Sequence, residues 1–146
     1  MKKVRDILNS KKDAKVYSVE PGLIVVDALR LMADKRVGAV LVLDNGKLVG
    51  IFSERDYARK IALMDRSSRD TPIRDVMTAN LVCVDPADTL EYCMELMTNK
   101  HIRHLPVLEN NELVGLISIG DVVKNTIEDQ KAMILQLEQY MRGETY

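Results

Sequence analysis

Apolar and polar positions along this chain change period in a regular order. Short runs rich in β-branched residues, "VYSV" at 16–19 and "LVCV" at 81–84, are typical of strands, and an acidic residue followed by proline closes each run with a turn. Apolar residues then recur at helical spacing between Val25 and Met32 and between Leu90 and Met97. The pattern predicts a short strand followed by an amphipathic helix, twice.

Two more strands and a helix should follow each amphipathic helix. The apolar runs "AVLVL" and "LVGIFS" flank the turn "DNGK", and "LPVL" and "LVGLIS" flank "ENNE". Asn45-Gly46 is a strong hairpin signal because both residue types accept positive φ. The serine that ends each second strand resembles a helix start, which predicts helices from about Glu54 to Met64 and from about Ile119 to Thr126.

The chain is an internal repeat. The stretch "GIFSERDYAR" at 50–59 returns 65 positions later as "GLISIGDVVK" at 115–124, with glycine, serine and aspartate in step. The same shift aligns residues 16–59 with 81–124 without a gap, and a fainter echo, "VRDIL" and "IRDVM", precedes each copy at a different offset. Neither copy has enough apolar surface to close a core alone, so we expect two copies to bury their sheets against each other.

The predicted fold class is therefore α/β, with two tandem βαββα repeats followed by a C-terminal amphipathic helix. The expected divisions are residues 1–65 for the first repeat with an N-terminal helix, 66–126 for a linker with the second repeat, and 127–146 for a C-terminal helix and tail.

The last of these segments has an amphipathic pattern of its own. Ile127, Ile134, Leu137 and Met141 fall near one stripe, and charged residues occupy the other faces. A helix ending near Gly143 could cover the core of its own module or pack against the matching helix of a second copy.

Composition excludes several classes of function. The chain carries 21 lysines and arginines against 22 acidic residues, without a basic stripe interleaved with aromatics, so no nucleic-acid partner is expected. No apolar run approaches the roughly 18 residues that cross a membrane, and the charged start of the chain lacks a signal-peptide core, which favours a cytoplasmic protein. Cys83 and Cys93 have neither metal-site nor redox spacing and should be buried, reduced packing residues.

The duplicated units, each with a hairpin, a "LVG" strand and a following aspartate, resemble the CBS domain pair, which is named after cystathionine β-synthase. The resemblance covers residues from about Val4 to Asn125. It implies a stand-alone regulatory module with pseudo-twofold symmetry, two clefts between the repeats that bind adenosine-containing ligands, and association into homodimers.

The repeated Ser-x-x-Asp motif has two interpretations. A carboxylate in the first turn of a helix can accept hydrogen bonds from both ribose hydroxyls, while a serine at the strand end lies near the free N–H groups that attract phosphate. Alternatively, Ser53 and Ser118 are only helix caps, and the aspartates only complement the helix dipole. The duplication and the resemblance favour ligand binding.

The resemblance also implies which residues surround each motif, because each cleft takes its motif from one repeat and its adenine pocket from the other. The residues implied for the first cleft are Ser53, Asp56, Thr78, Asn80, Val82, Ile102, Arg103 and His104. The residues implied for the second cleft are Ser118, Asp121, Lys15, Tyr17, Gly38 and Ala39.

The two clefts are expected to be unequal. "HIRHLP" offers Arg103 and His104 to a phosphate, whereas the equivalent "RVGAVL" offers Gly38 and Ala39 and has Leu41 where the family often places proline. This departure predicts weaker phosphate binding, or a differently shaped ligand, at the second cleft.

Basic residues near the first motif widen the range of ligands. Guanidinium groups bind phosphates bidentately, so this region could clamp a diphosphate. The residues are Arg55, Arg59, Lys60, Arg66, Arg69 and Arg74. NAD(H) is therefore a candidate ligand beside AMP, ADP and ATP, although the sequence has neither a Rossmann glycine turn nor a Walker loop.

Catalysis and metal binding are not expected. His101 and His104 lack a third ligand at useful spacing, and Ser53 and Ser118 lack the setting of a hydrolase nucleophile. We therefore predict a regulatory module whose regulated activity belongs to a partner protein. The alternatives are a constitutive interaction module without nucleotide and, third, a small enzyme that acts on the bound nucleotide.

Overall fold

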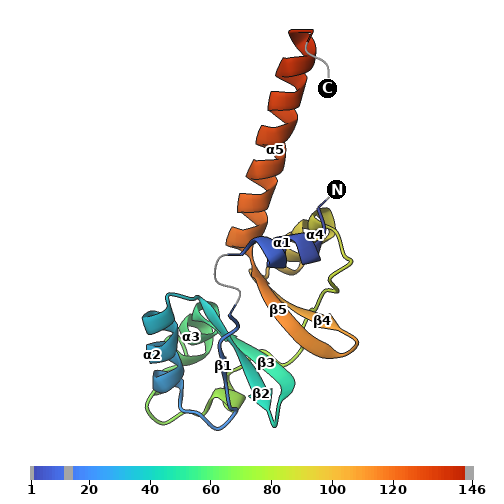
Figure 1. The fold of residues 1–146 in the computed structure, drawn as a ribbon. Helices are drawn as coiled ribbons and strands as arrows, with labels where there is room; N and C mark the ends of the chain where they lie inside the picture. The colour runs from blue at the N-terminus through green and yellow to red at the C-terminus, as the bar shows by residue number, and fades with distance from the viewer. Residues whose placement is uncertain (1, 12–14, 144–146) are drawn as a thin grey trace. The chain divides into compact units, whose positions relative to one another are not determined.

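The structure is a computed structural model that describes residues 2–11 and 15–143 (Figure 1). The chain divides into two compact units, residues 15–82 and residues 1–14 together with 83–146. We call them the repeat-1 unit and the repeat-2 unit, because each holds one copy of the repeat. The expected boundaries at 65 and 126 follow the repeat in the sequence, whereas these units follow the packing of the chain.

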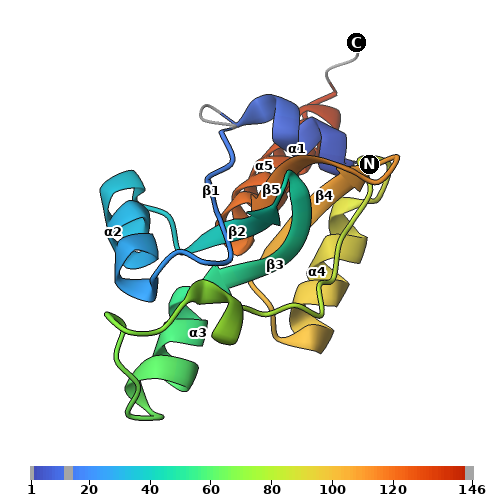
Figure 2. The same cartoon turned by 90° about the horizontal axis from the view of Figure 1, so that it is seen from below.

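The repeat-1 unit has a three-stranded sheet in the order β1-β2-β3, in which β2 runs parallel to β1 and antiparallel to β3. Figure 1 and Figure 2 show α2 and α3 on the same side of this sheet. Its elements are β1 (Ser18–Val19), α2 (Val25–Lys35), β2 (Ala39–Asp44), β3 (Lys47–Ser53), α3 (Glu54–Tyr57), a π-helical turn (Ala58–Ala62) and a 3-10 turn (Ile73–Asp75). The helix predicted from Glu54 is thus an α-helical turn continued by a π-helical one.

The repeat-2 unit has a two-stranded antiparallel sheet, β4-β5, flanked by three helices. Its elements are α1 (Val4–Ser10), α4 (Leu90–Lys100), β4 (His104–Glu109), β5 (Glu112–Ser118) and α5 (Ile119–Met141). The mixed α/β fold class, the two repeats and the C-terminal helix are therefore confirmed.

The strand predicted at "LVCV" is wrong as a strand. Only Val84 pairs, through a single parallel bridge to Val107. In the repeat-1 unit Leu41 donates its N–H to Tyr17 and so extends the parallel ladder. The equivalent position in β4 is Pro106, which has no N–H and cannot donate that bond.

The prediction of two separate C-terminal helices is also wrong. α5 runs without interruption over 23 residues from Ile119 to Met141. Between Asp121 and Arg142 the sequence has neither glycine nor proline, so nothing stops the helix that Ser118 begins. In Figure 1 its C-terminal half extends beyond α1 and α4 of the same unit.

The segments of the fainter echo are structurally equivalent, and each packs on the repeat that it does not directly precede. α1 contacts β5 and α5, whereas residues 71–77 pack on the start of α2. Three backbone hydrogen bonds recur as pairs: Val4 N to Asp88 O and Ile73 N to Leu23 O, Arg5 N to Pro86 O and Arg74 N to Pro21 O, and Leu90 N to Lys2 O and Val25 N to Thr71 O. We call residues 2–8 and 71–77 the two arms.

The glycine of the repeated motif makes room for these arms. A Cβ atom on Gly50 would lie 2.6 Å from the Met77 sulfur, and one on Gly115 would lie 2.7 Å from Leu8 Cδ2. Each arm also buries apolar side chains completely, as Val4 and Ile7 do in the repeat-2 unit. The motif therefore needs glycine for packing, independently of any ligand.

Both hairpin turns use left-handed residues. The predicted turn at Asn45 and Gly46 is confirmed, with φ angles of 51° and 81°. Asn110 and Asn111 do the same in the other repeat, with φ angles of 52° and 66°. Such turns match the twist of the flanking strands and fix their register.

The two cysteines differ in exposure. Both are free thiols, and Cys93 is buried, but Cys83 is only half-buried, so the prediction that both are buried was wrong for Cys83. Burial raises the pKa of both thiols, to about 11 for Cys93, where Asp88 adds to the effect. Within residues 2–11 and 15–143, no helix has both the length and the apolar character to cross a membrane.

Candidate functional site

The Ser-x-x-Asp motif of the repeat-1 unit forms a reciprocal capping box. Ser53 ends β3, and its Oγ accepts a hydrogen bond from Asp56 N at 3.2 Å. Asp56 Oδ2 in turn accepts from Ser53 N at 3.0 Å and from Ser53 Oγ at 3.1 Å. The helix-cap interpretation is therefore correct for this motif, and it leaves the other carboxylate oxygen for further contacts.

That other oxygen binds groups from outside the box. Asp56 Oδ1 accepts a hydrogen bond from Thr78 Oγ1 at 2.9 Å and forms an ion pair with Lys60 Nζ at 3.2 Å. Lys60 is held in place because it also donates to Val76 O at 3.1 Å. Asp56 is only 8% exposed. A helix cap does not require its carboxylate to be this buried, and burial of a charged group is costly.

The motif of the repeat-2 unit has the same box with a different cation. Ser118 N donates to Asp121 Oδ2 at 2.9 Å, and Asp121 N donates to Ser118 Oγ at 3.2 Å. Lys11, which directly follows α1, places its Nζ 2.9 Å from the same Oδ2 and 3.0 Å from Leu116 O. The segment after the arm therefore neutralises this aspartate, whereas in the other unit a lysine of the following helical turn does so.

Electrostatics keep Asp121 ionised. Burial raises the pKa of this carboxyl, but the hydrogen bonds from Ser118 and Lys11 outweigh burial, and the net pKa lies below the ordinary value. The group is therefore an acceptor at neutral pH, as a ribose-binding carboxylate has to be.

His104 lies beside this motif. It is the cross-strand partner of Ser118. Burial lowers its pKa; Asp121 opposes this shift, and the nearby cations reinforce it. His104 is thus mainly neutral at pH 7 and can accept as well as donate a hydrogen bond.

Each hairpin brings its first residues to the motif of the same repeat. Glu54 N donates to Gly38 O at 3.0 Å, and Ala39 pairs with Ser53 across the sheet. In the repeat-2 unit Ile119 N donates to Arg103 O at 2.8 Å. Gly38 and Ala39, which were expected in the second cleft, thus lie beside Ser53, and Arg103 and His104, which were expected in the first cleft, lie beside Ser118.

The remaining expected residues are exposed or half-buried. Lys15 lies over the Tyr17 ring, with Nζ 5.7 Å from the ring centre, and Lys35 lies at the same distance. Asn80 is exposed. Val82 and Ile102 are half-buried.

The basic residues of the expected diphosphate clamp are partly used within the repeat-1 unit. Lys60 binds Asp56, and Arg66 forms an ion pair with Asp75 at 3.3 Å. Lys11, by contrast, was missed from the sequence. The sequence shows only that Lys11 comes just after the first arm. This position predicts a contact with Asp121 only once the arm is known to pack on the repeat-2 unit.

The described parts of the chain gather no group of three or more histidine, cysteine, aspartate or glutamate side chains that could hold a metal ion. His101 and His104 belong to different elements, one at the end of α4 and one at the start of β4.

Two βαββα repeats, each ending its sheet in a serine–aspartate box at a helix start, define a tandem module of the CBS type. The CBS domain model matches residues 4–63 and 73–128, and the chain belongs to the CBS-domain family.

Individual relatives agree with this assignment. The mitochondrial CBS domain-containing protein CBSX3 of Arabidopsis thaliana is 39% identical over 124 residues, which are 82% of this chain and 60% of the relative, so the chain spans less than two thirds of that protein. A solved CBS-domain protein from Burkholderia ambifaria MC40-6 is 47% identical, with a TM-score of 0.86 over 88% of this chain and 96% of its own.

A more distant structure shares the fold alone. The CBS domain pair of protein MJ0100 is 21% identical, with a TM-score of 0.76 over 88% of this chain and 98% of its own. That protein was solved in complex with 5-methylthioadenosine and S-adenosyl-L-methionine.

Proposed function

We propose that this protein is a regulatory module that binds an adenosine-containing nucleotide, AMP, ADP, ATP or NAD(H), at its two Ser-x-x-Asp motifs. The observation that carries the proposal is the buried carboxylate of Asp56 at the start of a helix, which the half-buried Asp121 matches in the second unit. A helix cap alone does not need a buried, cation-paired carboxylate. A ligand with vicinal hydroxyls uses one.

In this proposal the aspartates accept the two ribose hydroxyls, and the lysines that now neutralise them turn to the phosphate. Lys11 Nζ lies 2.9 Å from Asp121 Oδ2, and Lys60 Nζ lies 3.2 Å from Asp56 Oδ1. Arg103 and His104 add donors beside Ser118. The ligand thus exchanges an internal ion pair for hydroxyl contacts and leaves the cation available for its own charge.

We propose that aliphatic side chains and backbone groups hold the adenine, with Thr78, Asn80, Val82 and Ile102 as the candidates for one base and Lys15, Tyr17, Gly38 and Ala39 as the candidates for the other. The MJ0100 complex supports the chemistry, because it shows that this fold accommodates adenosine-containing ligands.

Regulation requires more than binding. The ligand shifts the packing of repeats or protomers only if it binds two conformations with different affinities. We propose that this shift is passed to a partner protein that carries the regulated activity, within a homodimer in the cytoplasm. No catalytic role is assigned to any residue.

Calorimetric titration of the full chain with AMP, ATP, NADH and S-adenosylmethionine tests the proposal. Asp56→Asn and Asp121→Asn retain the size of the side chain and should each weaken binding at their own motif by about tenfold or more, because a charged hydrogen bond is worth about 1.5–3 kcal/mol. Asp6→Asn is the matched control: Asp6 caps α1 in the same way, accepting from Lys3 N at 2.9 Å, but lies outside both motifs.

Loss of binding in one or both motif variants, with Asp6→Asn unchanged, identifies the working motif. No heat with any ligand, from folded protein freed of carried-over nucleotide, would instead favour the constitutive interaction module. Conversion of the nucleotide during long incubation would indicate the small-enzyme alternative.

A further inference from the structure

Lys11 links the aspartate of the repeat-2 motif to the end of α1. It directly follows that helix, and its backbone N–H caps the helix by donating to Leu8 O at 3.4 Å. Its side chain reaches two other elements, because Nζ lies 2.9 Å from Asp121 Oδ2 and 3.0 Å from Leu116 O. The side chains of the ion pair are 24% exposed for Lys11 and 21% for Asp121. A pair at this depth is screened less by solvent and salt than one at the surface.

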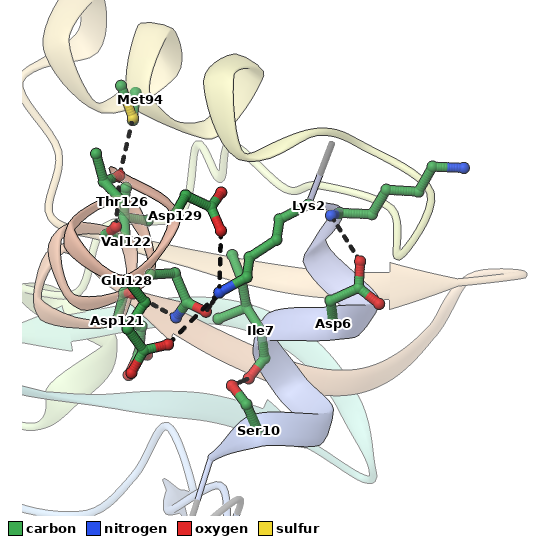
Figure 3. Close-up of polar contacts among 12 residues, drawn as sticks. Lys2, Asp6, Ile7, Ser10, Met94, Asp121, Val122, Thr126, Glu128 and Asp129 are labelled. Carbon is green, nitrogen blue, oxygen red and sulfur yellow. Dashed lines mark hydrogen bonds and ion pairs between the residues drawn. The ribbon is translucent and has the colours of Figure 1, made fainter. Parts of the chain in front are cut away.

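The first arm, residues 2–8, is held by other contacts along the rest of its length. Lys2 Nζ pairs with Glu128 at 3.5 Å and with Asp129 at 3.3 Å on α5 (Figure 3). Apolar side chains of the arm are fully buried, and α1 contacts both β5 and α5. Lys11 therefore fastens the end of α1, whereas the start and the middle of the arm have contacts of their own.

A ribose at Asp121 competes with Lys11 for one carboxylate oxygen. Each oxygen of a carboxylate has two lone pairs, and Asp121 Oδ2 already accepts from Ser118 N and from Lys11 Nζ. The bond from Ser118 belongs to the capping box that begins α5. Two vicinal hydroxyls engage both oxygens of a carboxylate, so a ribose that binds here replaces Lys11 at Oδ2.

We propose that Lys11 makes the first arm sensitive to the charge of the ligand at Asp121. A phosphorylated nucleotide gives the displaced ammonium group a new anion, so Lys11 and the end of α1 stay in place. An uncharged nucleoside takes the carboxylate and supplies no anion, so Lys11 loses its partner and the end of α1 loosens. This inference rests on the proposed function, because it requires a ribose at Asp121.

The same exchange makes Lys11 a specificity-determining residue. An uncharged nucleoside has to break a half-buried ion pair without compensation, whereas the phosphate of a nucleotide compensates for the loss. We therefore expect the repeat-2 motif to bind AMP more tightly than adenosine by about tenfold or more, which is the scale of one hydrogen bond to a charged group. Arg103 and His104 also lie beside Ser118, so the test has to change Lys11 alone.

The repeat-1 motif connects its cation to its arm in a different way. Lys60, which pairs with Asp56, lies on the helical segment of the motif itself and also donates to Val76 O at 3.1 Å and to Met77 O at 3.5 Å in the second arm. These two bonds remain when a ribose takes Asp56, so the second arm should stay in place whatever the charge of the ligand. The residue 65 positions after Lys60 is Asn125, so in the repeat-2 unit the cation comes from the segment after α1 instead.

Calorimetric titration with AMP, ATP and adenosine tests the selectivity, in an Asp56→Asn background that weakens the repeat-1 motif. Lys11→Met removes the charge and should weaken the binding of AMP and ATP and strengthen that of adenosine, so that the ratio of affinities falls about tenfold. Lys11→Arg keeps the charge and should keep the ratio. Lys3→Met removes a charge from an exposed residue of the same arm and should leave all affinities unchanged. Equal weakening of all three ligands by Lys11→Met would show a merely structural lysine and overturns the proposal.

Hydrogen exchange followed by mass spectrometry tests the coupling to the arm. In the Asp56→Asn background, saturating adenosine should speed the exchange of the backbone amides of α1, whereas saturating AMP should not. With Lys11→Met added, this exchange should be faster from the start and respond to neither ligand. In an Asp121→Asn background, adenosine should leave the exchange of residues 71–77 unchanged. Equal responses of α1 to AMP and to adenosine while Lys11 is present overturn the proposal.

These measurements separate the role of Lys11 from the proposed function. If the wild-type protein binds none of the three ligands, both proposals fail. If it binds nucleotide and adenosine, but Lys11→Met leaves their affinity ratio and the exchange of α1 unchanged, nucleotide binding stands and the role of Lys11 is excluded.

Discussion

At the scale of single residues, the serine–aspartate box supports two tasks with one geometry. The serine hydroxyl and the aspartate carboxylate satisfy free N–H groups at a helix start, and the same arrangement fixes the carboxylate for a ligand. The two copies differ in what surrounds them. Asp56 is buried against Thr78, whereas Asp121 is more exposed and depends on Lys11 from another segment.

His104 should make the stability of the protein depend on pH. Burial lowers its pKa below the ordinary value of about 6.5. The unfolded chain therefore binds a proton near pH 6.5, and the folded chain does so only at lower pH. The contribution of the neutral side chain is fully present above pH 6.5 and is lost as the pH falls through the folded pKa.

Urea unfolding between pH 7.5 and 5 measures this effect. The free energy of unfolding should fall toward low pH, and His104→Gln should flatten the part of the slope that His104 causes. Equal slopes in wild type and His104→Gln would show that His104 does not couple to folding.

At the scale of elements, most helices and hairpins could be predicted from the sequence. Both hairpins, both amphipathic helices and both helix starts follow from apolar periodicity, the Asn-Gly signal and the Ser-x-x-Asp motif. The loss of the first strand in the second repeat could also have been predicted from the sequence. Pro106 stands where the first repeat has Leu41, whose N–H donates to the first strand, and proline has no N–H to donate.

The role of Lys11 and the exchange of the arms could not be predicted in the same way. Both depend on which repeat each arm packs against, and nothing in the local pattern of either arm specifies this. The repeat spacing identified the arms as copies, but only packing shows that Leu8 approaches Gly115 and Met77 approaches Gly50.

The two hairpin turns offer a test of turn chemistry in one protein. Asn111 has a φ of 66° where the first repeat has Gly46 at 81°. Glycine adopts this conformation at a lower cost than asparagine, so Asn111→Gly should stabilise the protein by about 0.5 kcal/mol and Gly46→Asn should destabilise it by a similar amount.

Thermal and urea unfolding of these two variants and of the double variant Gly46→Asn/Asn111→Gly check this prediction. The two effects should nearly cancel in the double variant, because the turns belong to different units and independent effects add. A destabilised Asn111→Gly or a stabilised Gly46→Asn variant would show that side-chain contacts, rather than backbone conformation, dominate at these turns.

At the scale of the whole molecule, the arms tie the order of the chain to the packing of its units. The first arm, residues 2–8, packs in the repeat-2 unit although it precedes the first repeat in the sequence. The second arm, residues 71–77, packs in the repeat-1 unit although it directly precedes the second repeat. The repeat-2 unit is therefore built from two separated stretches of chain, and the repeat-1 unit from one continuous stretch that includes the second arm. Damage to one arm should loosen the unit on which that arm packs.

A matched pair of substitutions tests which unit each arm supports. Ile7 and Ile73 are both fully buried, one in each arm, and replacement of a buried isoleucine by alanine costs about 2–5 kcal/mol. Cys93 is buried in the repeat-2 unit, so its rate of modification by a thiol reagent, followed by mass spectrometry beside the half-buried Cys83, reports the opening of that unit. Ile7→Ala should therefore accelerate modification of Cys93 strongly, while Ile73→Ala should increase backbone hydrogen exchange in α2 and leave Cys93 slow. Equal acceleration of Cys93 modification by both substitutions would mean instead that the two units open together, so that the loss of either arm is felt by the whole chain.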